Sequence, residues 1–451
     1  MMGYQNLREF VKVLRDNGEL VEIGASLSPR YEIGAALRYL DQRSGKAVLF
    51  KNAAGYNCPV IGNLLGSNKR LALALEVEPE HVLEEFKKRT QQLIKPVVVS
   101  KGPVQEIVLS EEIDLLKVIP ALTHHEKDAG PYLTSALVVA VDPDSGERGM
   151  GIHRILIKDK NKIGLFLYNP PIGAYFHKAE QRGKPLDIAV VLGVDPALFL
   201  ASIASNQGGK LNKFEMAGGL KGGPVELVPT ADSGLEIPAQ AEFVLLGKVL
   251  PGIRESEGPF GESSGYYLTY QNPVGVIHTI MHRQEPLYHA LMPYNRENSL
   301  LLNLIWESSY GTTLKKEIPQ LTDFRLTSVL GMCALLQIKK TAEGQPKEIL
   351  EHVLKSSPLI KSAVVVDTDV DLSDLGEVSW AISTRFQPHR DLLLLNDMTG
   401  YPLDPSADNS VTSKWGIDAT KPLGQESLFE KVEVPQQAMQ KVSSILQGLF
   451  N

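Results

Sequence analysis

Arg154 is the first residue whose type and surroundings suggest chemistry. It lies in an apolar segment, residues 149–157, and if this segment is a single β-strand, Arg154 shares a face with Ile152 and Leu156. Burying an arginine without a partner is strongly unfavourable, so we expect a carboxylate or an anionic ligand to face it. The alternative is an arginine at a strand edge that reaches solvent, and the segment alone does not separate the two interpretations.

Two carboxylates flank a Gly-Pro-Phe-Gly segment, residues 258–261. Glycine and proline exclude a helix there and predict a tight, fixed turn between Glu257 and Glu262. Rigidly placed acids suit general acid–base chemistry, because position matters as much as pKa. One acid could pair with an arginine while the other, less paired, holds a proton. The alternative is an acidic turn on the surface without a chemical role.

Other polar residues give weaker signals. His124 and His125 would point opposite ways on a strand, and His278 and His282 would lie about 13 Å apart on one strand face, so neither pair predicts a metal site. Lys414 stands beside a tryptophan in a polar stretch and could reach a phosphate, although a solvated lysine is the ordinary interpretation. The sequence contains no Walker-type loop, dinucleotide-binding glycine fingerprint or Gly-x-Ser-x-Gly elbow.

The elements that must position these residues belong to a chain of 451 residues, a length that predicts about three domains. Hydrophobic residues make up 43% and charged residues 22%, so a sizeable core is possible. A net charge of −7 argues against general binding to nucleic acids or anionic membranes, which needs a basic surface. Two cysteines, Cys58 and Cys333, favour a reducing compartment, and with no signal-peptide or membrane-spanning run we expect a cytoplasmic protein.

Residue patterns predict three regions. Residues 1–117 mix helical and strand-like segments, residues 118–297 alternate strand-like runs with turn residues, and residues 298–451 return to an α/β pattern. The middle region is therefore expected to be a largely antiparallel barrel or sandwich. Helices are expected from Leu7 to just before Gly18 and at residues 31–40, 79–94, 346–354 and 435–450. Strands are expected at residues 134–141, 152–158, 188–192, 243–249, 275–281, 363–366 and 391–395.

Several ordered blocks, spread over nearly the whole chain, resemble the UbiD family of reversible decarboxylases. The strongest are Gly-Ile-His-Arg at residues 151–154 and Glu-Gly-Pro-Phe-Gly-Glu at residues 257–262, followed by Gly-Tyr-Tyr at residues 265–267. The other blocks are His-Glu-Lys-Asp-Ala-Gly-Pro-Tyr at residues 125–132, Ala-Gly-Gly-Leu at 217–220, Pro-Val-Glu-Leu-Val at 224–228, Ser-Lys at 413–414 and Asp-Ala-Thr at 418–420. Their shared order and separation argue against a chance match.

The resemblance implies an α+β fold with a central flavin-reductase-like split β-barrel, residues 118–297, that binds prenylated FMN or FMN. An N-terminal α/β domain (residues 1–117) and a C-terminal α/β dimerisation domain with a terminal helix (residues 298–451) flank it, and the active site lies between the central and C-terminal domains. A homodimer or homohexamer, and a flavin prenyltransferase that supplies the cofactor, are further implications. Gly151 and Ile152 would line the flavin, and Lys414 would contact its phosphate.

The family's Glu-Arg-Glu triad falls on Glu257, Arg154 and Glu262. The resemblance implies that Arg154 binds the carboxylate of a small unsaturated or aromatic acid as a bidentate fork. Glu257 would hold Arg154 and take part in maturing the cofactor, and Glu262 would deliver a proton to the carbon left after carbon dioxide departs. The identity of the acid and the direction of the reaction are not encoded in these motifs.

One part of the family pattern is missing. The family usually holds the cofactor phosphate through a divalent metal bound by Asn, His and Glu, but these positions are Gly149, Pro171 or Ile172, and Lys213 here. We hypothesise that no metal is bound and that the Lys213 ammonium takes its place beside the phosphate. The competing hypothesis is a protein with an altered cofactor, which binds another phosphorylated ligand or serves as a non-catalytic subunit of a larger carboxylase complex.

Overall fold

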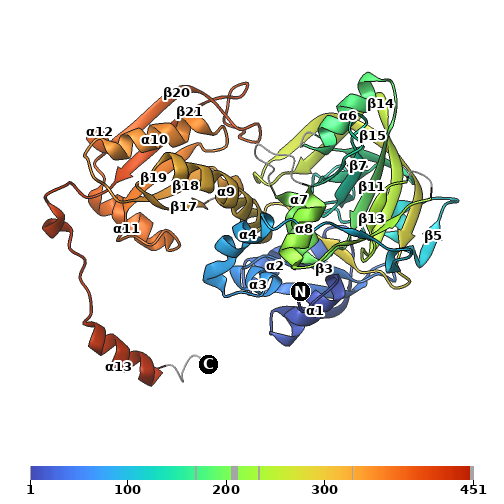
Figure 1. The fold of residues 1–451 in the computed structure, drawn as a ribbon, viewed down its shortest axis with the longest axis horizontal. Coiled ribbons are helices and arrows are strands. Elements are labelled where there is room, and N and C mark those ends of the chain that lie inside the picture. The colour runs from blue at the N-terminus through green and yellow to red at the C-terminus, as the bar shows by residue number, and fades with distance from the viewer. Residues whose placement is uncertain (1, 168–169, 205–211, 232–233, 328, 447–451) are drawn as a thin grey trace. The chain divides into compact units, whose positions relative to one another are not determined.

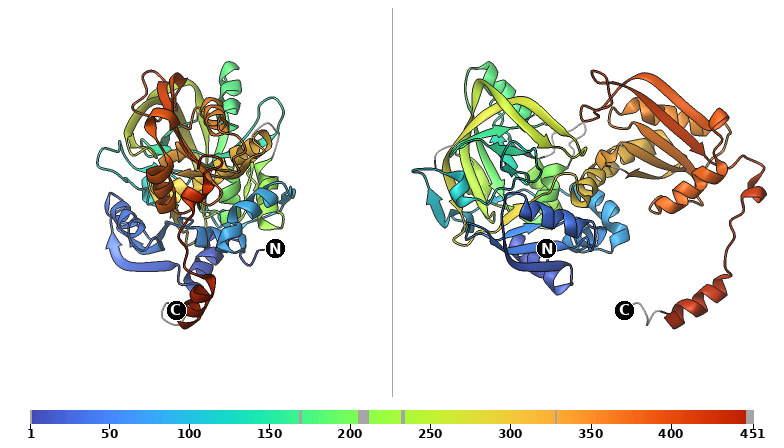
Figure 2. Two further views of the ribbon diagram at one scale, coloured as in Figure 1. Left: turned by 90° about the vertical axis from the view of Figure 1, so that its left-hand side faces the viewer. Right: turned by 180° about the vertical axis from the view of Figure 1, so that it is seen from behind.

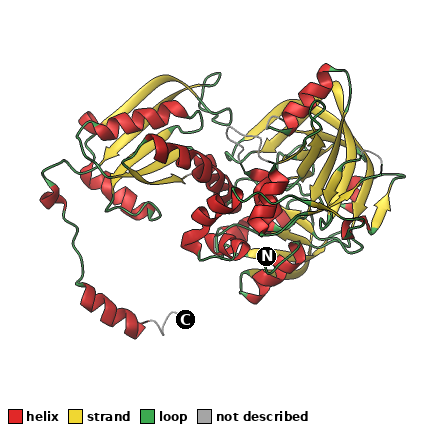
Figure 3. Ribbon diagram, viewed as in Figure 1, coloured by secondary structure: helices red, strands yellow, loops and turns green. Residues whose placement is uncertain are grey.

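The computed structural model describes residues 2–167, 170–204, 212–231, 234–327 and 329–446, and the chain divides into two compact units. Unit 1 comprises Met1–Leu314, Leu326–Met332 and Gly400–Ser410, and unit 2 comprises Lys315–Arg325, Cys333–Thr399 and Val411–Asn451. Helices and sheets are mixed in both units, as expected (Figures 1 and 3). The boundaries of the three-domain division stay a prediction.

The largest sheet of unit 1 carries most of the segments that the sequence singled out. It has nine strands in the order β6-β9-β10-β15-β14-β11-β7-β8, with β5 paired to β15, and it is strongly curved (Figure 2). The pairs β7–β8, β10–β15, β11–β14 and β14–β15 are antiparallel, as predicted. The strands are β5 (Ile107–Leu109), β6 (Tyr132–Leu133), β7 (Leu137–Val141), β8 (Arg148–Ile152), β9 (Ile155–Ile157), β10 (Lys162–Leu165), β11 (Leu186–Leu192), β14 (Phe243–Gly261) and β15 (Tyr267–His282).

The central strands of this sheet are buried on both faces. In β11, Val190 belongs to one hydrophobic cluster and its neighbour Val191 to the other, and in β14 Leu245 and Leu246 divide in the same way. Continuous apolar runs of this kind fit strands that are covered on both sides. Helices α7 (Pro196–Ile203) and α8 (Lys213–Lys221) contribute to one cluster, and α6 (Ile172–Gln181) contributes to the other.

Two smaller sheets complete unit 1. The first has the order β1-β2-β3-β16, from β1 (Leu20–Leu27), β2 (Ala47–Ala53), β3 (Val60–Gly62) and β16 (Tyr288–Ala290). The second has the order β13-β12-β4, from β13 (Glu236–Pro238), β12 (Glu226–Pro229) and β4 (Val97–Val98). The remaining helices are α1 (Leu7–Asp16), α2 (Glu32–Asp41), α3 (Asn68–Leu75), η1 (Pro79–His81), α4 (Val82–Thr90), η2 (Pro103–Gln105), α5 (Leu115–Val118), η3 (Val329–Gly331) and the first part of α9 (Arg296–Glu317).

Helix α1 shows how directly local sequence sets local structure. The Asn6 side chain accepts the Glu9 backbone N–H and caps the helix, and Leu7, Phe10 and Leu14 bury one stripe at helical spacing. Gly18, with φ of 69°, follows the helix end in the left-handed conformation that glycine tolerates best. The helix expected from Leu7 to just before Gly18 is confirmed.

The sheet of the C-terminal part has five strands in the order β17-β18-β19-β21-β20. The pairs β18–β19 and β19–β21 are parallel, and β20 closes the edge antiparallel to β21. Its elements are β17 (Leu321–Thr327), β18 (Cys333–Ile338), α10 (Gln345–Ser356), β19 (Ser362–Asp367), α11 (Leu375–Arg385), α12 (Pro388–Asp391), β20 (Leu392–Thr399), β21 (Val411–Ala419), η4 (Glu426–Phe429) and α13 (Gln436–Leu446). Helix α13 matches the expected terminal helix, except that residues 447–450 of the prediction lie outside the described residues.

Among the described residues, no helix has both the length and the apolar content that a membrane span requires.

Candidate active site

The structure corrects the prediction of one strand over residues 149–157. Strand β8 ends at Ile152 and β9 begins at Ile155, so Arg154 lies in a break between two strands. Backbone hydrogen bonds fix the break, since the Phe166 N–H donates to the Arg154 carbonyl at 3.3 Å and the His153 N–H donates to the Ala136 carbonyl at 2.9 Å. Arg154 and Ile152 still line the same pocket, so the predicted shared environment holds although the single strand does not.

Arg154 has the carboxylate partners that burial demands. Its side chain is 9% exposed, and Nη2 and Nε donate to the two oxygens of Glu257 at 2.9 and 3.3 Å. The remaining terminal nitrogen, Nη1, contacts Oε1 of Glu262. The guanidinium also lies 4.2 Å from the ring centre of Phe166 and 4.7 Å from that of Phe260. A planar cation among aromatic rings and two carboxylates is held in one orientation.

Glu257 is a buried anion whose hydrogen-bonding capacity is well used. It is fully buried, and besides Arg154 it accepts the Asn272 side-chain N–H at 2.8 Å. Three N–H donors stabilise the ionised form of a carboxylate. The pKa of the neighbouring Tyr132 hydroxyl is raised, chiefly by burial and further by the charge of Glu257. Glu257 is therefore arranged to hold Arg154 in place.

The Gly-Pro-Phe-Gly segment is not the turn that the sequence predicted. Strand β14 continues through it to Gly261, and a register shift between Glu257 and Phe260 makes it a β-bulge against β15. Gly258 has φ of 118°, and a Cβ atom there would lie 2.6 Å from the Leu268 carbonyl oxygen, so only glycine fits. Bulges redirect side chains, which explains how Glu257 and Glu262 both reach Arg154.

Asp128 fixes this bulge, a role that the sequence reasoning missed. Its Oδ1 accepts the Gly261 N–H at 2.8 Å, and its Oδ2 accepts the N–H groups of His124 and His125 at 3.1 and 2.9 Å. Burial alone would raise the pKa of Asp128, but these hydrogen bonds and the proximity of His125 outweigh burial and hold its pKa below the ordinary value. Asp128 thus ties the segment before β6 to the residue that precedes Glu262.

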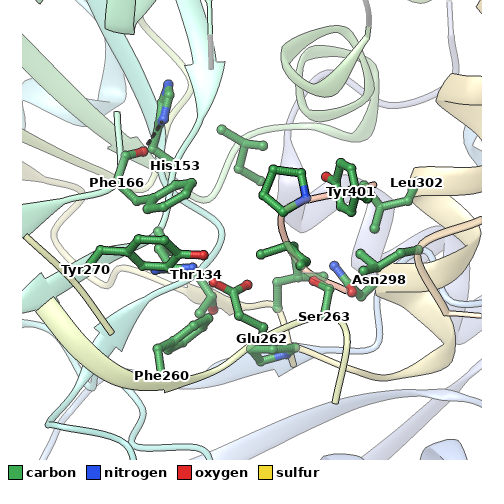
Figure 4. A pocket seen from close by; sticks show the side chains of 17 residues that line it. Thr134, His153, Phe166, Phe260, Glu262, Ser263, Tyr270, Asn298, Leu302 and Tyr401 are labelled. Atoms are coloured by element: carbon green, nitrogen blue, oxygen red, sulfur yellow. Dashed lines mark hydrogen bonds and ion pairs between the residues drawn. The ribbon is translucent and has the colours of Figure 1, made fainter. Parts of the chain in front are cut away.

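These groups border a pocket within unit 1 of about 490 Å³. Figure 4 shows the rings of Phe166, Tyr270 and Phe260 on one side, with Glu262 pointing in beside them and Asn298, Leu302 and Tyr401 opposite. The full lining is Thr134, Ile152, His153, Arg154, Phe166, Phe260, Glu262, Ser263, Tyr270, Leu291, Pro293, Asn298, Leu302, Leu330, Tyr401, Pro402 and Leu403. An apolar cavity with a few convergent polar groups is the usual form of a small-molecule site.

Three lining residues carry polar atoms with no hydrogen-bond partner, namely Thr134 Oγ1, His153 Nε2 and Asn298 Oδ1. Buried polar atoms are normally satisfied, so their presence along one cavity points to a ligand with several polar groups. Aromatic walls and unmatched polar atoms fit a flavin, which combines a flat ring system with a polar arm. Of the predicted flavin-lining residues, Ile152 lines this pocket, and Gly151 stands directly before it in β8.

The positions at which the family pattern has metal ligands do not form a metal site in this protein. Gly149 has no side chain, and a Cβ atom there would lie 2.7 Å from both Pro171 Cγ and Tyr175 Cε2, so a larger residue would not fit. Pro171 offers no ligand atom, and Lys213 is a cation. Among the residues that the structure describes, no three His, Cys, Asp or Glu side chains group closely enough to hold a metal ion. The side chains at these three positions therefore do not fit a divalent cation.

The two lysines predicted to meet a phosphate are placed differently. Lys213 begins α8 in unit 1, and its ammonium donates to the Ser202 carbonyl at 2.7 Å. Lys414 lies in β21 of unit 2, is 1% exposed, and donates to the carbonyls of Leu354 and Ser357 at 2.9 and 2.6 Å. Burial lowers the pKa of each to about 8. The phosphate contact of Lys414 stays a prediction, and its observed contacts are structural.

The chain is similar to proteins of one family over nearly its whole length. Three models of the UbiD family, described as the N-terminal, Rift-related and C-terminal domains of 3-octaprenyl-4-hydroxybenzoate carboxy-lyase, match residues 11–90, 95–296 and 300–419. The anhydromevalonate phosphate decarboxylase of Methanosarcina mazei is 34% identical, over 95% of this chain and 99% of its own.

Two solved structures are similar throughout. The UbiD-class enzyme HmfF from Pelotomaculum thermopropionicum in complex with FMN superposes with a TM-score of 0.92 at 37% identity, covering 98% of this chain and 100% of the other. An evolved dimeric form of that enzyme in complex with prFMN gives a TM-score of 0.87 at 36% identity, with the same coverage. The chain belongs to the UbiD family of decarboxylases, as its motifs predicted.

Proposed function

We propose that this protein is a reversible, non-oxidative decarboxylase that uses prenylated FMN to act on a small unsaturated or aromatic carboxylic acid. The observation that carries the proposal is Arg154, a nearly buried guanidinium held by Glu257 that meets Glu262 at the wall of an aromatic-lined pocket. Family membership supports the reaction class, and the FMN and prFMN in the similar HmfF structures support the cofactor class.

Arg154 would bind the substrate carboxylate through the edge that Glu257 leaves available. That edge ends in Nη1, which contacts Glu262, so an incoming carboxylate competes with Glu262 for the same nitrogen. Two anions on one nitrogen repel each other, and a neutral Glu262 removes this repulsion. Substrate binding therefore favours Glu262 as the protonated acid, which is the form that can donate a proton.

Glu262 would then act as the general acid. The bond between the substrate carbon and its carboxylate breaks, carbon dioxide leaves, and the electron pair left on the carbon takes the proton from Glu262 Oε. The ionised Glu262 regains a proton from solvent before the next turnover, so the overall change is one carboxylate and one proton converted to carbon dioxide and the protonated product. In the reverse direction Glu262 removes that proton.

Glu257 has a separate task, because Arg154 and Asn272 occupy both of its oxygens with three N–H donors. It would keep Arg154 charged and oriented during the reaction. When bound, the prenylated flavin would supply an electron sink for the electron pair of the breaking bond. Ile152 and Phe166 would pack on the ring system, and the Gly151 backbone would approach it closely.

Several finer features of the family are part of the same proposal. The curved nine-stranded sheet would be the central split β-barrel, flanked by the two α/β regions. The family resemblance supports a homodimer or homohexamer, a flavin prenyltransferase as the cofactor supplier, and a cytoplasmic location. The evolved dimeric form of HmfF supports self-association as a property of this structural class.

Co-expression with a flavin prenyltransferase tests the proposal directly. The purified protein should carry a flavin visible in its absorption spectrum and should release carbon dioxide from at least one member of a panel of aromatic and α,β-unsaturated acids. A protein that binds no flavin under these conditions would contradict the proposal and favour another phosphorylated ligand. A flavin-loaded protein inactive on the whole panel, in both directions, would favour a non-catalytic subunit.

A further inference from the structure

We propose that this protein holds the ribityl phosphate arm of its flavin without a metal ion, through Lys213 on the phosphate and His153 on a ribityl hydroxyl. The inference rests on the proposed flavin cofactor and concerns how the arm is recognised. It follows from two side chains that lack partners among the described residues. Lys213 is a cation without an anion, and His153 has a ring nitrogen without a hydrogen-bond donor.

Lys213 is the cation. Its ammonium donates to the Ser202 carbonyl, and no carboxylate among the described residues pairs with it. A largely buried ammonium without an anionic partner is unfavourable, which its lowered pKa of about 8 reflects. An anionic ligand would supply the missing charge. A lysine binds phosphate as a point charge through up to three N–H donors.

His153 is the unmatched lone pair. Its Nδ1 lies 2.8 Å from the Phe166 carbonyl oxygen and must donate to it, so in the neutral ring Nε2 is an acceptor. Nε2 is buried without a partner on a side chain that is 3% exposed, and it points away from Phe166 (Figure 4). Burial lowers the pKa of His153 to about 4, so the ring is neutral and accepts a hydrogen bond at physiological pH. A ligand hydroxyl would satisfy it.

The two groups lie on elements that pack together, because helix α8, which begins at Lys213, contacts strand β8, which ends one residue before His153. At the start of β8 the Arg148 guanidinium lies 5.5 Å from the ring centre of Phe214, the residue after Lys213. The positive charge of Lys213 also contributes to lowering the pKa of His153. Gly151 leaves the space beside Nε2 uncrowded, since a Cβ atom there would lie 3.1 Å from it. A hydroxyl-bearing chain that ends in phosphate matches this arrangement.

Three flavins of increasing length separate the two contacts. Lumiflavin has the ring alone, riboflavin adds the ribityl chain, and FMN adds the phosphate. Apoprotein is titrated with each flavin in the presence of EDTA, with the quenching of flavin fluorescence as the readout. We expect FMN to bind more tightly than riboflavin by about 10- to 100-fold without any metal.

The variants then assign each contact. Lys213→Met should weaken FMN about 10- to 100-fold and leave riboflavin unchanged, and Lys213→Arg should restore most of the FMN affinity. His153→Phe, which keeps the ring volume, should weaken FMN and riboflavin by the same factor, about 5- to 10-fold, and leave lumiflavin unchanged. Lys248→Met, at an exposed lysine of β14 in the same unit, is the matched control and should change nothing.

Two results with the parent protein would overturn the inference while leaving the proposed function intact. One is FMN and riboflavin binding with equal affinity. The other is an FMN affinity that collapses in EDTA and returns with manganese bound at one ion per chain. An apoprotein that binds none of the three flavins would overturn the proposed function as well. Equal loss of all three flavins in Lys213→Met, with a lowered melting temperature, would assign Lys213 to the fold and contradict its phosphate contact.

Discussion

Two buried cations of unit 1, Arg154 and Lys213, are satisfied to opposite degrees. Arg154 is held by two carboxylates and faces aromatic rings, whereas Lys213 has a single carbonyl partner. The difference predicts what each does with an incoming anion. At Arg154 a carboxylate must displace Glu262, which couples binding to a proton. At Lys213 an anion meets N–H donors that are still available, so binding needs no exchange.

We expect the largest effect when Glu262, the proton donor beside Arg154, loses its acidic proton. Glu262→Gln keeps the size and a hydrogen bond to Arg154 but carries no transferable proton, so turnover should fall about 100- to 10,000-fold while flavin stays bound. Carbon dioxide release and the visible spectrum measure the two quantities. Glu255→Gln is the matched control, because Glu255 lies on β14, which ends just before Glu262, and is paired to Lys158 and Lys162 outside the pocket. Wild-type turnover in Glu262→Gln would assign the proton to another group.

We expect the next largest effect when the segment that positions Glu262 loses its support from Asp128. Asp128→Asn replaces a carboxylate that accepts three backbone N–H groups with an amide that has one acceptor oxygen, so the bulge before Glu262 should lose its fixed position. We expect kcat to fall about 10- to 100-fold with little change in KM or in flavin affinity.

Asp142→Asn is the control for Asp128→Asn, because Asp142 is a buried carboxylate of the same unit that accepts a backbone N–H away from the pocket. If both variants lost the same activity, or if Asp128→Asn lost flavin as well, Asp128 would be a general support of the fold and not a positioning residue.

A smaller effect concerns Lys414, which resembles Lys213 in type and pKa but donates to two carbonyls of unit 2, whereas Lys213 donates to one carbonyl. Lys414→Met leaves both carbonyls unpaired and should lower the free energy of unfolding by about 2 kcal/mol without changing the ratio of FMN to riboflavin affinity. Chemical denaturation measures the free energy of unfolding, and flavin titration measures the two affinities. A loss of FMN affinity alone would restore the phosphate contact that the family resemblance implied.

The sequence predicted the family, the α/β character and the Arg154, Glu257 and Glu262 group, because these depend on residue types in short, ordered blocks. It misplaced the local geometry. The break after Ile152 and the bulge at Gly258 are set by pairing with distant segments, which no local periodicity encodes.

The roles of Asp128 and His153 and the burial of Lys414 could not be predicted from the sequence. The first two lay inside recognised blocks, so a signal was present, but their roles depend on which backbone groups the fold brings near them. Lys414 looked exposed because a serine and a tryptophan flank it, yet it lies on a central strand whose neighbours bury it. Burial of a single long side chain is decided by tertiary packing.

Two buried acids, Glu257 and Glu297, differ in the number of their hydrogen-bond partners as Arg154 and Lys213 do, and the smallest expected effect concerns Glu297. Glu257 has three N–H donors, whereas Glu297 at the start of α9 is fully buried, accepts the Leu65 N–H at 2.5 Å, and has no partner at Oε2. Burial raises the pKa of Glu297 to about 7, against the lowering effects of Leu65 and Arg70. Because the folded state holds this proton more tightly than the unfolded state, its contribution to stability is present at low pH and is lost as pH rises towards and beyond about 7.

Glu297→Gln mimics the neutral acid at every pH, so its stability relative to the parent protein should rise with pH. Between pH 6 and pH 8 the difference in free energy of unfolding should grow by about 1 kcal/mol in favour of the variant. Denaturation curves of both proteins at the two pH values measure it. Glu307→Gln is the control, since that buried acid of the same helix accepts the Leu326 N–H at 2.8 Å. A difference that is constant with pH would mean that Glu297 keeps one protonation state across this range and that its pKa does not lie near 7.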